Sequence, residues 1–268
     1  MNIISDILTY PFMQRALIAS VVVGILCSYA GCFVVMRRMA FFSDAIAHAA
    51  FAGIAAGMLL NIDYSISSVV VAILIAFFIA YLSEKTTLSN DTAIGIGFSA
   101  AIASGMLIIG MLDGYRGDLF GFLFGDILTI SNNDLLLLSV VGIIVLSTLV
   151  IFLKPLLQIA FNKDIAKVEG TKVRLFEYLL FFVIALVVTV SLKIVGIILV
   201  TSLLIVPAAS AKNLATNMRQ LFGLSITFGV ISGIAGLMLS IHFNSPSGPT
   251  IVLVSIGIFF LTLLKRKA

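Results

Sequence analysis

Long apolar runs, separated by short stretches with charges or turn residues, dominate the chain. Each run has about the 20 residues that a helix needs to cross a hydrocarbon core of ~30 Å. The pattern predicts an all-α, polytopic membrane protein, a single transmembrane domain over residues 1–268 with about eight to nine spans. The expected spans are 14–36, 39–60, 64–83, 92–112, 134–153, 175–193, 195–211, 220–241 and 249–264.

Two stretches depart from this pattern. Residues 113–133 are too polar to cross a membrane, and the segment "LFGFLFGDIL" within them is interpreted as a short helix at the surface. The N-terminal segment 1–13 is amphipathic, which is typical of a helix that lies at the membrane interface.

The distribution of charge sets the orientation and excludes one class of partner. Only 10% of the 268 residues are charged, against about a quarter in soluble domains. The net charge of +4 comes from residues scattered over the ends of the spans, which does not indicate nucleic-acid binding. If the first span runs from outside to inside, every lysine and arginine except Arg15, Arg116 and Lys193 falls on the inner side. Such an excess is typical of the cytoplasmic face, so the C-terminus is expected in the cytoplasm.

Asp44 and His48 lie in the run "FFSDAIAHAAFAGIA" at 41–55, inside the second expected span. Four residues apart on a helix, they differ by about 40° of rotation and one turn of rise, so they share one face. If the helix begins near Met39, His48 lies roughly 15 Å into it, close to the middle of the hydrocarbon core. Ionisable groups at that depth are costly and usually mark an ion site or a pathway.

Small residues surround this pair. Its face continues as Ala52 and Ala56, so no bulky side chain is expected above the histidine. The adjoining row would let another helix approach closely: Ala45, Ala49, Gly53 and Gly57. One carboxylate oxygen and one imidazole nitrogen suit Zn²⁺, Mn²⁺ or Fe²⁺ better than Mg²⁺ or Ca²⁺, which prefer oxygen ligands. The sequence therefore predicts a transition-metal site at Asp44 and His48.

The residues alone leave other interpretations open. Asp44 and His48 could form a structural hydrogen bond, relay protons in a gradient-driven transporter, or hold a metal in a membrane enzyme. The sequence offers no nucleophile and no third or fourth metal ligand near Asp44 and His48, which counts against the membrane enzyme. His242, the only other histidine, is interpreted as part of a helix end or of the interface rather than as a ligand. Because no G-x-x-x-x-G-K-[ST] motif occurs, the chain is not expected to hydrolyse ATP by that route and would use an ion gradient or a separate ATPase.

The run "GCFVVMRRMAFFSDAIAHAAFAGIAAG" resembles the signature of the permease subunit of bacterial zinc, manganese and iron ABC importers. That family carries paired arginines followed by G-D-x-x-x-H-x-x-x-x-G-[IV]-A, and here Ser43 replaces the glycine. Three further blocks agree in order and spacing, so the resemblance covers nearly the whole chain: "YRGDLFGFLFGDILTIS", "KIVGIILVTSLLIVPAASAKNLA" and "SPSGPTIVLVSIGIFFL".

The resemblance implies the permease of an importer in the bacterial plasma membrane. Two permeases would form one pathway, with two cytoplasmic ATPase subunits and an extracytoplasmic metal-binding protein as partners. Asp44 and His48 match the pathway positions of the motif. No permanently bound cofactor is implied, because Zn²⁺ or Mn²⁺ would be the transported substrate. The likeness leans toward the zinc-type members without deciding the metal.

The resemblance also implies an ATPase contact within residues 154–174. Ala166 and Gly170 match the A-x-x-x-G core of that element, where small residues would let a short helix dock closely. The chain departs from the family pattern at Asn162, where an aspartate is common, and at Glu169, where an apolar residue is common.

Overall fold

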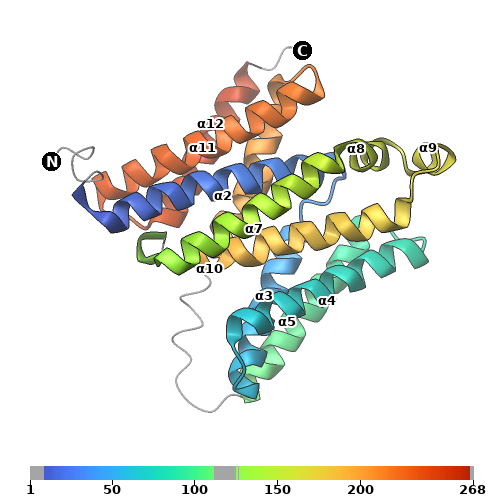
Figure 1. The fold of residues 1–268 in the computed structure, drawn as a ribbon, viewed down its shortest axis with the longest axis horizontal. Helices are drawn as coiled ribbons and strands as arrows, with labels where there is room; N and C mark the ends of the chain where they lie inside the picture. Colours follow the sequence, from blue (N-terminus) through green and yellow to red (C-terminus); the bar gives the residue numbers. More distant parts are fainter. Residues whose placement is uncertain (1–8, 112–124, 126, 266–268) are drawn as a thin grey trace. The chain divides into compact units, whose positions relative to one another are not determined.

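A computed structural model describes residues 9–111, 125 and 127–265 of the chain (Figure 1). Apart from a 3-10 turn, η1 (Ile127–Thr129), the secondary structure of these residues is α-helical. The α-helices are α2 (Pro11–Met36), α3 (Phe42–Leu60), α4 (Tyr64–Lys85), α5 (Asn90–Met111), α7 (Asn132–Ile151), α8 (Leu153–Phe161), α9 (Lys163–Val168), α10 (Val173–Leu214), α11 (Met218–Phe243) and α12 (Ser247–Leu264). Within the described ranges, 8 helices are long and apolar enough to cross a membrane, which confirms the predicted all-α membrane fold.

The long helix α10 replaces two of the predicted spans. Its 42 residues would extend about 63 Å, twice the thickness of a hydrocarbon core. Gly196 interrupts the helical backbone with φ 78° and ψ 168°, next to the predicted boundary between 193 and 195. A Cβ atom on Gly125 would lie only 2.3 Å from the backbone of Val195 and Gly196, so this break is packed tightly against the connection before η1. The break leaves two pieces of span length.

The contacts divide the chain into two compact units whose boundaries fall inside α2, α7 and α10. Unit 1 comprises Met1–Cys32, Gly121–Ile144 and Ser191–Ala268, and unit 2 comprises Phe33–Phe120 and Val145–Val190. Each unit is built from segments that are separated in the sequence, and helices α2, α7 and α10 run from one unit into the other. The prediction of a single transmembrane domain over residues 1–268 remains a prediction.

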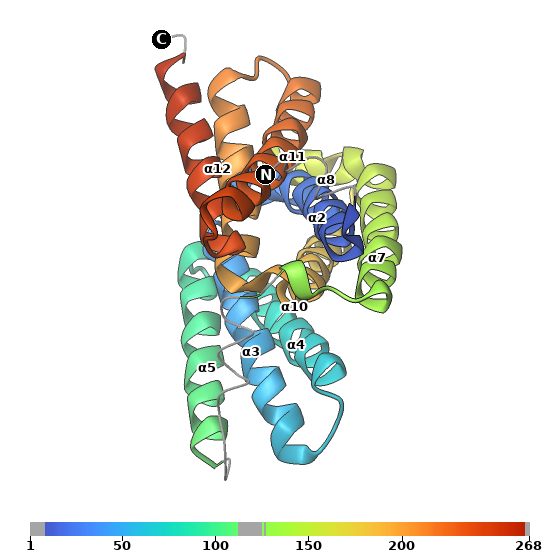
Figure 2. The ribbon, with the colours of Figure 1, turned by 90° about the vertical axis from the view of Figure 1, so that its left-hand side faces the viewer.

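In unit 2, α3, α4 and α5 pack side by side (Figure 2). The small residues of α3 make this possible: a Cβ on Gly53 would lie 2.7 Å from the Ser67 carbonyl oxygen of α4, and one on Gly57 would lie 2.9 Å from the Tyr64 Cα. On α5, Gly97 packs against Ile79 of α4 in the same way. The predicted close approach along the Gly53–Gly57 row is therefore confirmed.

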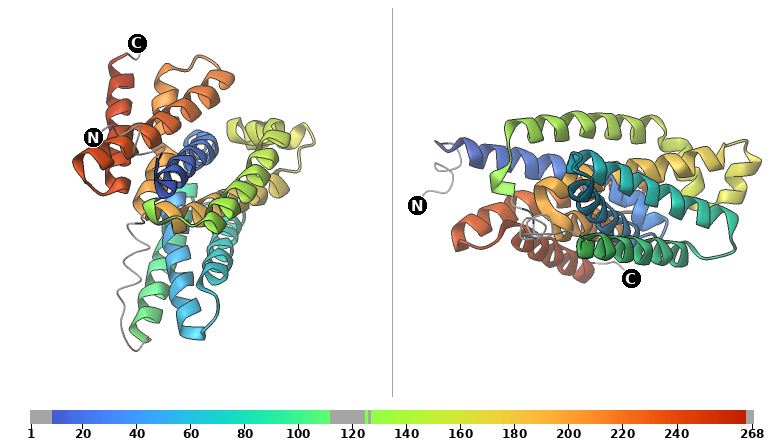
Figure 3. Two further views of the ribbon diagram at one scale, coloured as in Figure 1. Left: turned by 60° about the vertical axis from the view of Figure 1, so that its left-hand side comes forward. Right: turned by 90° about the horizontal axis from the view of Figure 1, so that it is seen from below.

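Unit 1 holds most of α2, the second half of α10, and the pair α11 and α12, which Figure 3 shows as the orange and red helices. Close backbone contacts also build this unit, since a Cβ on Gly31 of α2 would lie 1.8 Å from the Leu204 carbonyl oxygen of α10. Lys193 and Asp134, which are both expected on the outer side, form an ion pair of 2.9 Å. The pair joins the start of α7 to α10 within unit 1.

Two predictions lie largely outside the described residues. The short surface helix expected in "LFGFLFGDIL" falls on 112–124 and 126, except for Gly125 and the start of η1. Of the amphipathic segment 1–13, the structure describes the part from residue 9, and α2 begins there at Pro11.

Candidate metal site on α3

The connection between α2 and α3 sets the position of the candidate ligands. The end of α2 is closed by two backbone hydrogen bonds, from Met39 N to Val34 O (3.0 Å) and from Arg38 N to Val35 O (3.3 Å). Arg38 takes the left-handed conformation with φ 54°, which completes a Schellman motif. Helix α3 then begins at Phe42, three residues later than Met39. His48 therefore lies about 9 Å along the helix instead of the expected 15 Å.

Asp44 lies in the first turn of α3, and both Asp44 and His48 are half-buried. A carboxylate near a helix N-terminus is stabilised by the helix dipole. The ring Nδ1 of His48 lies 2.9 Å from the backbone carbonyl oxygen of Asp44. Because a carbonyl can only accept a hydrogen bond, Nδ1 is the donor in this contact, and in the neutral imidazole Nε2 then carries the lone pair that a metal ion would bind.

Helix α5 supports the imidazole from the side. The Phe98 ring meets the His48 ring edge-on, with centroids 5.0 Å apart and an interplanar angle of 76°. The backbone bond at Nδ1 and this aromatic contact together restrict the orientation of the ring. A ligand held in this way loses less conformational freedom when it binds an ion.

The alanines above His48 do not form an open column along their whole length. Ala52 is buried, and a Cβ on Gly105 of α5 would lie 3.1 Å from the Ala52 Cβ. Helix α5 therefore packs against α3 at this level, and the contact is made by two small residues, Ala52 and Gly105. The small side chain of Ala52 serves the packing of α5 against α3.

One chain supplies an incomplete metal shell in its described part. No group of three or more His, Cys, Asp or Glu side chains that could hold a metal occurs among these residues. Zn²⁺ in proteins takes four ligands, of which Asp44 and His48 would supply two. His242 lies in unit 1, in the last turn of α11, where its ring contacts Phe243 edge-on with centroids 5.0 Å apart.

The predicted ATPase-contact segment contains two short helices, α8 and α9. Asn162 caps α9 by accepting hydrogen bonds from the backbone of Asp164 (2.9 Å) and Ile165 (3.1 Å), so this departure from the family pattern keeps the capping function of an aspartate. The second departure, Glu169, accepts a hydrogen bond from the side chain of Gln158 on α8. Asn162 thus caps the start of α9, and Glu169 joins the end of α9 to α8.

Ala166 and Gly170 occupy different environments in this segment. Ala166 lies in α9 with 1% of its surface exposed. Gly170 lies beyond the end of α9 with φ 81°, and a Cβ there would meet nothing within 4 Å. Thr171 N donates to Ala166 O (2.9 Å) and Gly170 N donates to Lys167 O (3.2 Å), which closes α9 with a second Schellman motif. Gly170 therefore provides the positive φ that the end of α9 requires. Nothing in the described part of this chain limits the size of a side chain at position 170.

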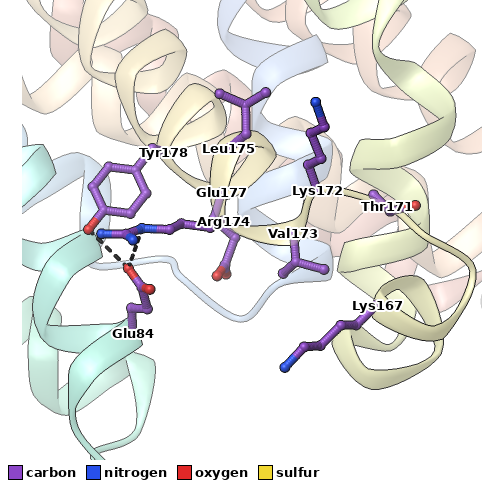
Figure 4. Close-up of a pocket in the computed structure, with 9 residues that line it drawn as sticks. All are labelled: Glu84, Lys167, Thr171, Lys172, Val173, Arg174, Leu175, Glu177 and Tyr178. Atoms are coloured by element: carbon purple, nitrogen blue, oxygen red, sulfur yellow. Dashed lines mark hydrogen bonds and ion pairs between the residues drawn. The ribbon is translucent and has the colours of Figure 1, made fainter.

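Sequence reasoning missed a cluster of charges at the start of α10. Glu177 pairs with Arg37 and with Lys163, at 2.7 Å from the latter. A second group joins α4 to α10, because Arg174 pairs with Glu84 (3.1 Å) and the Tyr178 hydroxyl donates to the same carboxylate (3.2 Å) (Figure 4). The sequence does carry a signal for these pairs, because Glu84 and Glu177 are acidic residues that lie close to basic residues at the ends of expected spans.

A model of the ABC 3 transport family matches residues 9–266. The chain belongs to this family. It is 37% identical over 256 residues to the manganese transport system membrane protein MntC of Halalkalibacterium halodurans, which covers 96% of this chain and 88% of that protein. It is 36% identical over 258 residues to the high-affinity zinc uptake system membrane protein ZnuB of Haemophilus influenzae, with 96% and 99% covered.

The fold agrees with this membership in the ABC 3 transport family. The solved structure of PsaBC from Streptococcus pneumoniae in complex with Fab matches with a TM-score of 0.85 and 36% identity, over 97% of this chain and 94% of that one. The chain is thus a multi-pass membrane subunit of a bacterial ABC importer. The gradient-driven transporter that the residues left open is not supported.

Proposed function

We propose that the chain is the permease through which an ABC importer moves Zn²⁺ or Mn²⁺, and that Asp44 and His48 are ligands of the passing ion. The observation that carries this proposal is the contact of 2.9 Å between His48 Nδ1 and the Asp44 carbonyl oxygen. With Nδ1 in that contact, Nε2 of the neutral imidazole would be the metal-binding atom, one turn from the Asp44 carboxylate. The relatives named for manganese and for zinc transport support the metal class.

The partners follow from the same proposal. Two copies of the chain would each bring an aspartate and a histidine to one shared site, which gives the four ligands that zinc takes. Two cytoplasmic ATPase subunits would dock at α9, and an extracytoplasmic binding protein would deliver the ion. The C-terminus would lie in the cytoplasm, as the distribution of basic residues predicts.

Uptake of radiolabelled Zn²⁺ and Mn²⁺ by cells that carry the whole transporter tests the site. Asp44→Ala and His48→Ala should each abolish uptake while the permease still inserts and binds its ATPase. His242→Ala is the matched control, because it removes the other histidine of the chain, and it should leave uptake unchanged. Uptake at the wild-type rate in well-expressed Asp44→Ala and His48→Ala variants would exclude the proposed site.

A further inference from the structure

A buried ionic cluster joins three separate segments of unit 2. Glu177 lies near the start of α10, Arg37 in the connection between α2 and α3, and Lys163 at the first position of α9. Both cations pair with the same oxygen, Oε1 of Glu177. The side chains of Arg37 and Glu177 are 3% and 14% exposed, whereas that of Lys163 is 39% exposed. The carboxylate therefore contacts both α9 and the α2–α3 connection.

The cluster is not an efficient way to stabilise the fold. It contains two cations and one carboxylate, and the Nη1 atom of Arg37 is buried without a hydrogen-bond partner in the described part of the structure. Removing charges from water is expensive, and apolar contacts can hold buried segments together as well or better. A surplus charge and an unused donor in this place favour a functional reason for the cluster.

Arg37 is linked tightly to the helix that carries Asp44 and His48. The Schellman motif around Arg38 leaves five residues between Met36 and the first residue of α3, and Met39 in that connection is fully buried. Phe42, the first residue of α3, meets the Phe181 ring edge-on with centroids 4.8 Å apart. Arg37 is thus connected to the first turn of α3 by a short segment that is packed against α10.

Helix α10 contacts this connection through two residues on one face. Phe181 lies one turn beyond Glu177, and its ring also contacts the Arg37 guanidinium, whose central carbon is 5.9 Å from the ring centroid. Glu177 and Phe181 therefore hold Arg37 and the start of α3 together. Lys163 connects α9 to the same place through Glu177.

We propose that Glu177 is a positioning residue that couples movement of α9 to the start of α3. This inference rests on the proposed function, in which α9 contacts the ATPase and α3 carries the metal ligands. When the ATPase moves α9 and Lys163 away from Oε1 of Glu177, the attraction between Glu177 and Arg37 becomes stronger. When Lys163 approaches Oε1, that attraction becomes weaker. The first turn of α3, with Asp44, then shifts with Arg37.

The neighbouring ion pair supplies a matched control. Glu84 and Arg174 lie in the same pocket of about 770 Å³ as Glu177, and Figure 4 shows them turned toward each other. Their ion pair and the hydrogen bond from Tyr178 join α4 to α10. Replacing Glu84 therefore removes a charge beside α10 without touching Lys163 or Arg37.

The test uses the complete transporter, with its ATPase and binding protein, reconstituted in liposomes. The measured quantity is the amount of Zn²⁺ or Mn²⁺ transported per ATP hydrolysed. Lys163→Gln should lower this ratio about fivefold or more, the range of an ordinary coupling between two sites. Because Lys163 is partly exposed and Glu177 keeps Arg37, the variant should fold and bind metal as the wild type does. Dividing the transported metal by the ATP hydrolysed removes any change in the amount of bound ATPase from the comparison. Lys163→Arg should restore the ratio, and Glu84→Gln should leave it unchanged.

A double-mutant cycle separates coupling from simple stabilisation. Glu177→Gln should also lower the ratio, and Lys163→Gln with Glu177→Gln should be no worse than Glu177→Gln alone, because Lys163 acts through Glu177. A wild-type ratio in Lys163→Gln, or losses that add in the double variant, would overturn the inference while leaving the proposed transport intact. A wild-type transporter that moves neither metal would overturn the proposed function and this inference with it.

Discussion

Replacing Gly53 with alanine should destabilise the packing of the helix that carries the candidate site. The added Cβ would lie 2.7 Å from the Ser67 carbonyl oxygen and from the Ser68 Cα, both backbone atoms of α4. Ordinary contact begins at 3.4 Å, so α3 and α4 must separate by about 0.7 Å. Overpacking of this kind costs about 1–3 kcal/mol.

Gly95→Ala is the matched control for this change. Gly95 lies in α5, also within a helix, and a Cβ there would meet nothing within 4 Å. Both substitutions gain the same helix propensity, about 1 kcal/mol, so their difference isolates the α3–α4 contact. We expect Gly53→Ala to unfold about 5 °C below Gly95→Ala in detergent, followed by circular dichroism. Equal midpoints for the two variants would show that the contact between α3 and α4 is not as close as described.

Two further predictions concern α9 and the shared site. Gly170→Val should weaken binding of the ATPase, because the positive φ costs a β-branched residue about 1–2 kcal/mol, whereas Gly170→Asn should bind normally in a pull-down assay. Equal binding by the two variants would contradict a backbone role for Gly170. In a linked permease dimer, His48→Ala in one half should abolish transport, since in the proposed site the described part of each chain would supply only two of the four ligands. Half the wild-type rate with an unchanged apparent affinity would instead indicate that each chain conducts alone.

The spans were predictable from the sequence because their signals are local. Apolar runs end where charges and turn residues begin, and the helices α4, α7 and α12 start within two residues of the predicted positions. The start of α3 was placed three residues too early for a physical reason. The connection contains apolar residues such as Met39, and its left-handed turn is formed by Arg38 rather than by a glycine. An arginine carries no sequence signal for a positive φ.

The site was partly predictable for the same reason. The helical spacing of Asp44 and His48 placed them on one face, but the hydrogen bond that fixes the ring goes to the backbone carbonyl, which a side-chain pattern does not show. The ionic cluster was not predictable, because Arg37, Lys163 and Glu177 are separated by more than a hundred residues or lie in different helices. Such pairing depends on tertiary packing, and no local periodicity reports it.

The packing of unit 2 determines how far a movement at Arg37 would spread. Helix α3 cannot slide past α4, because Gly53 places the two backbones in contact, and α5 meets α3 closely at Gly105. Helices α4 and α5 are joined in turn where Gly97 packs on Ile79. Close-packed interfaces shift between discrete arrangements and do not deform continuously. A displacement of the first turn of α3 should therefore move α3, α4 and α5 as one body. Asp44, His48 and the supporting Phe98 ring would move together, so the geometry of the two candidate ligands would stay the same while their neighbours outside these three helices change.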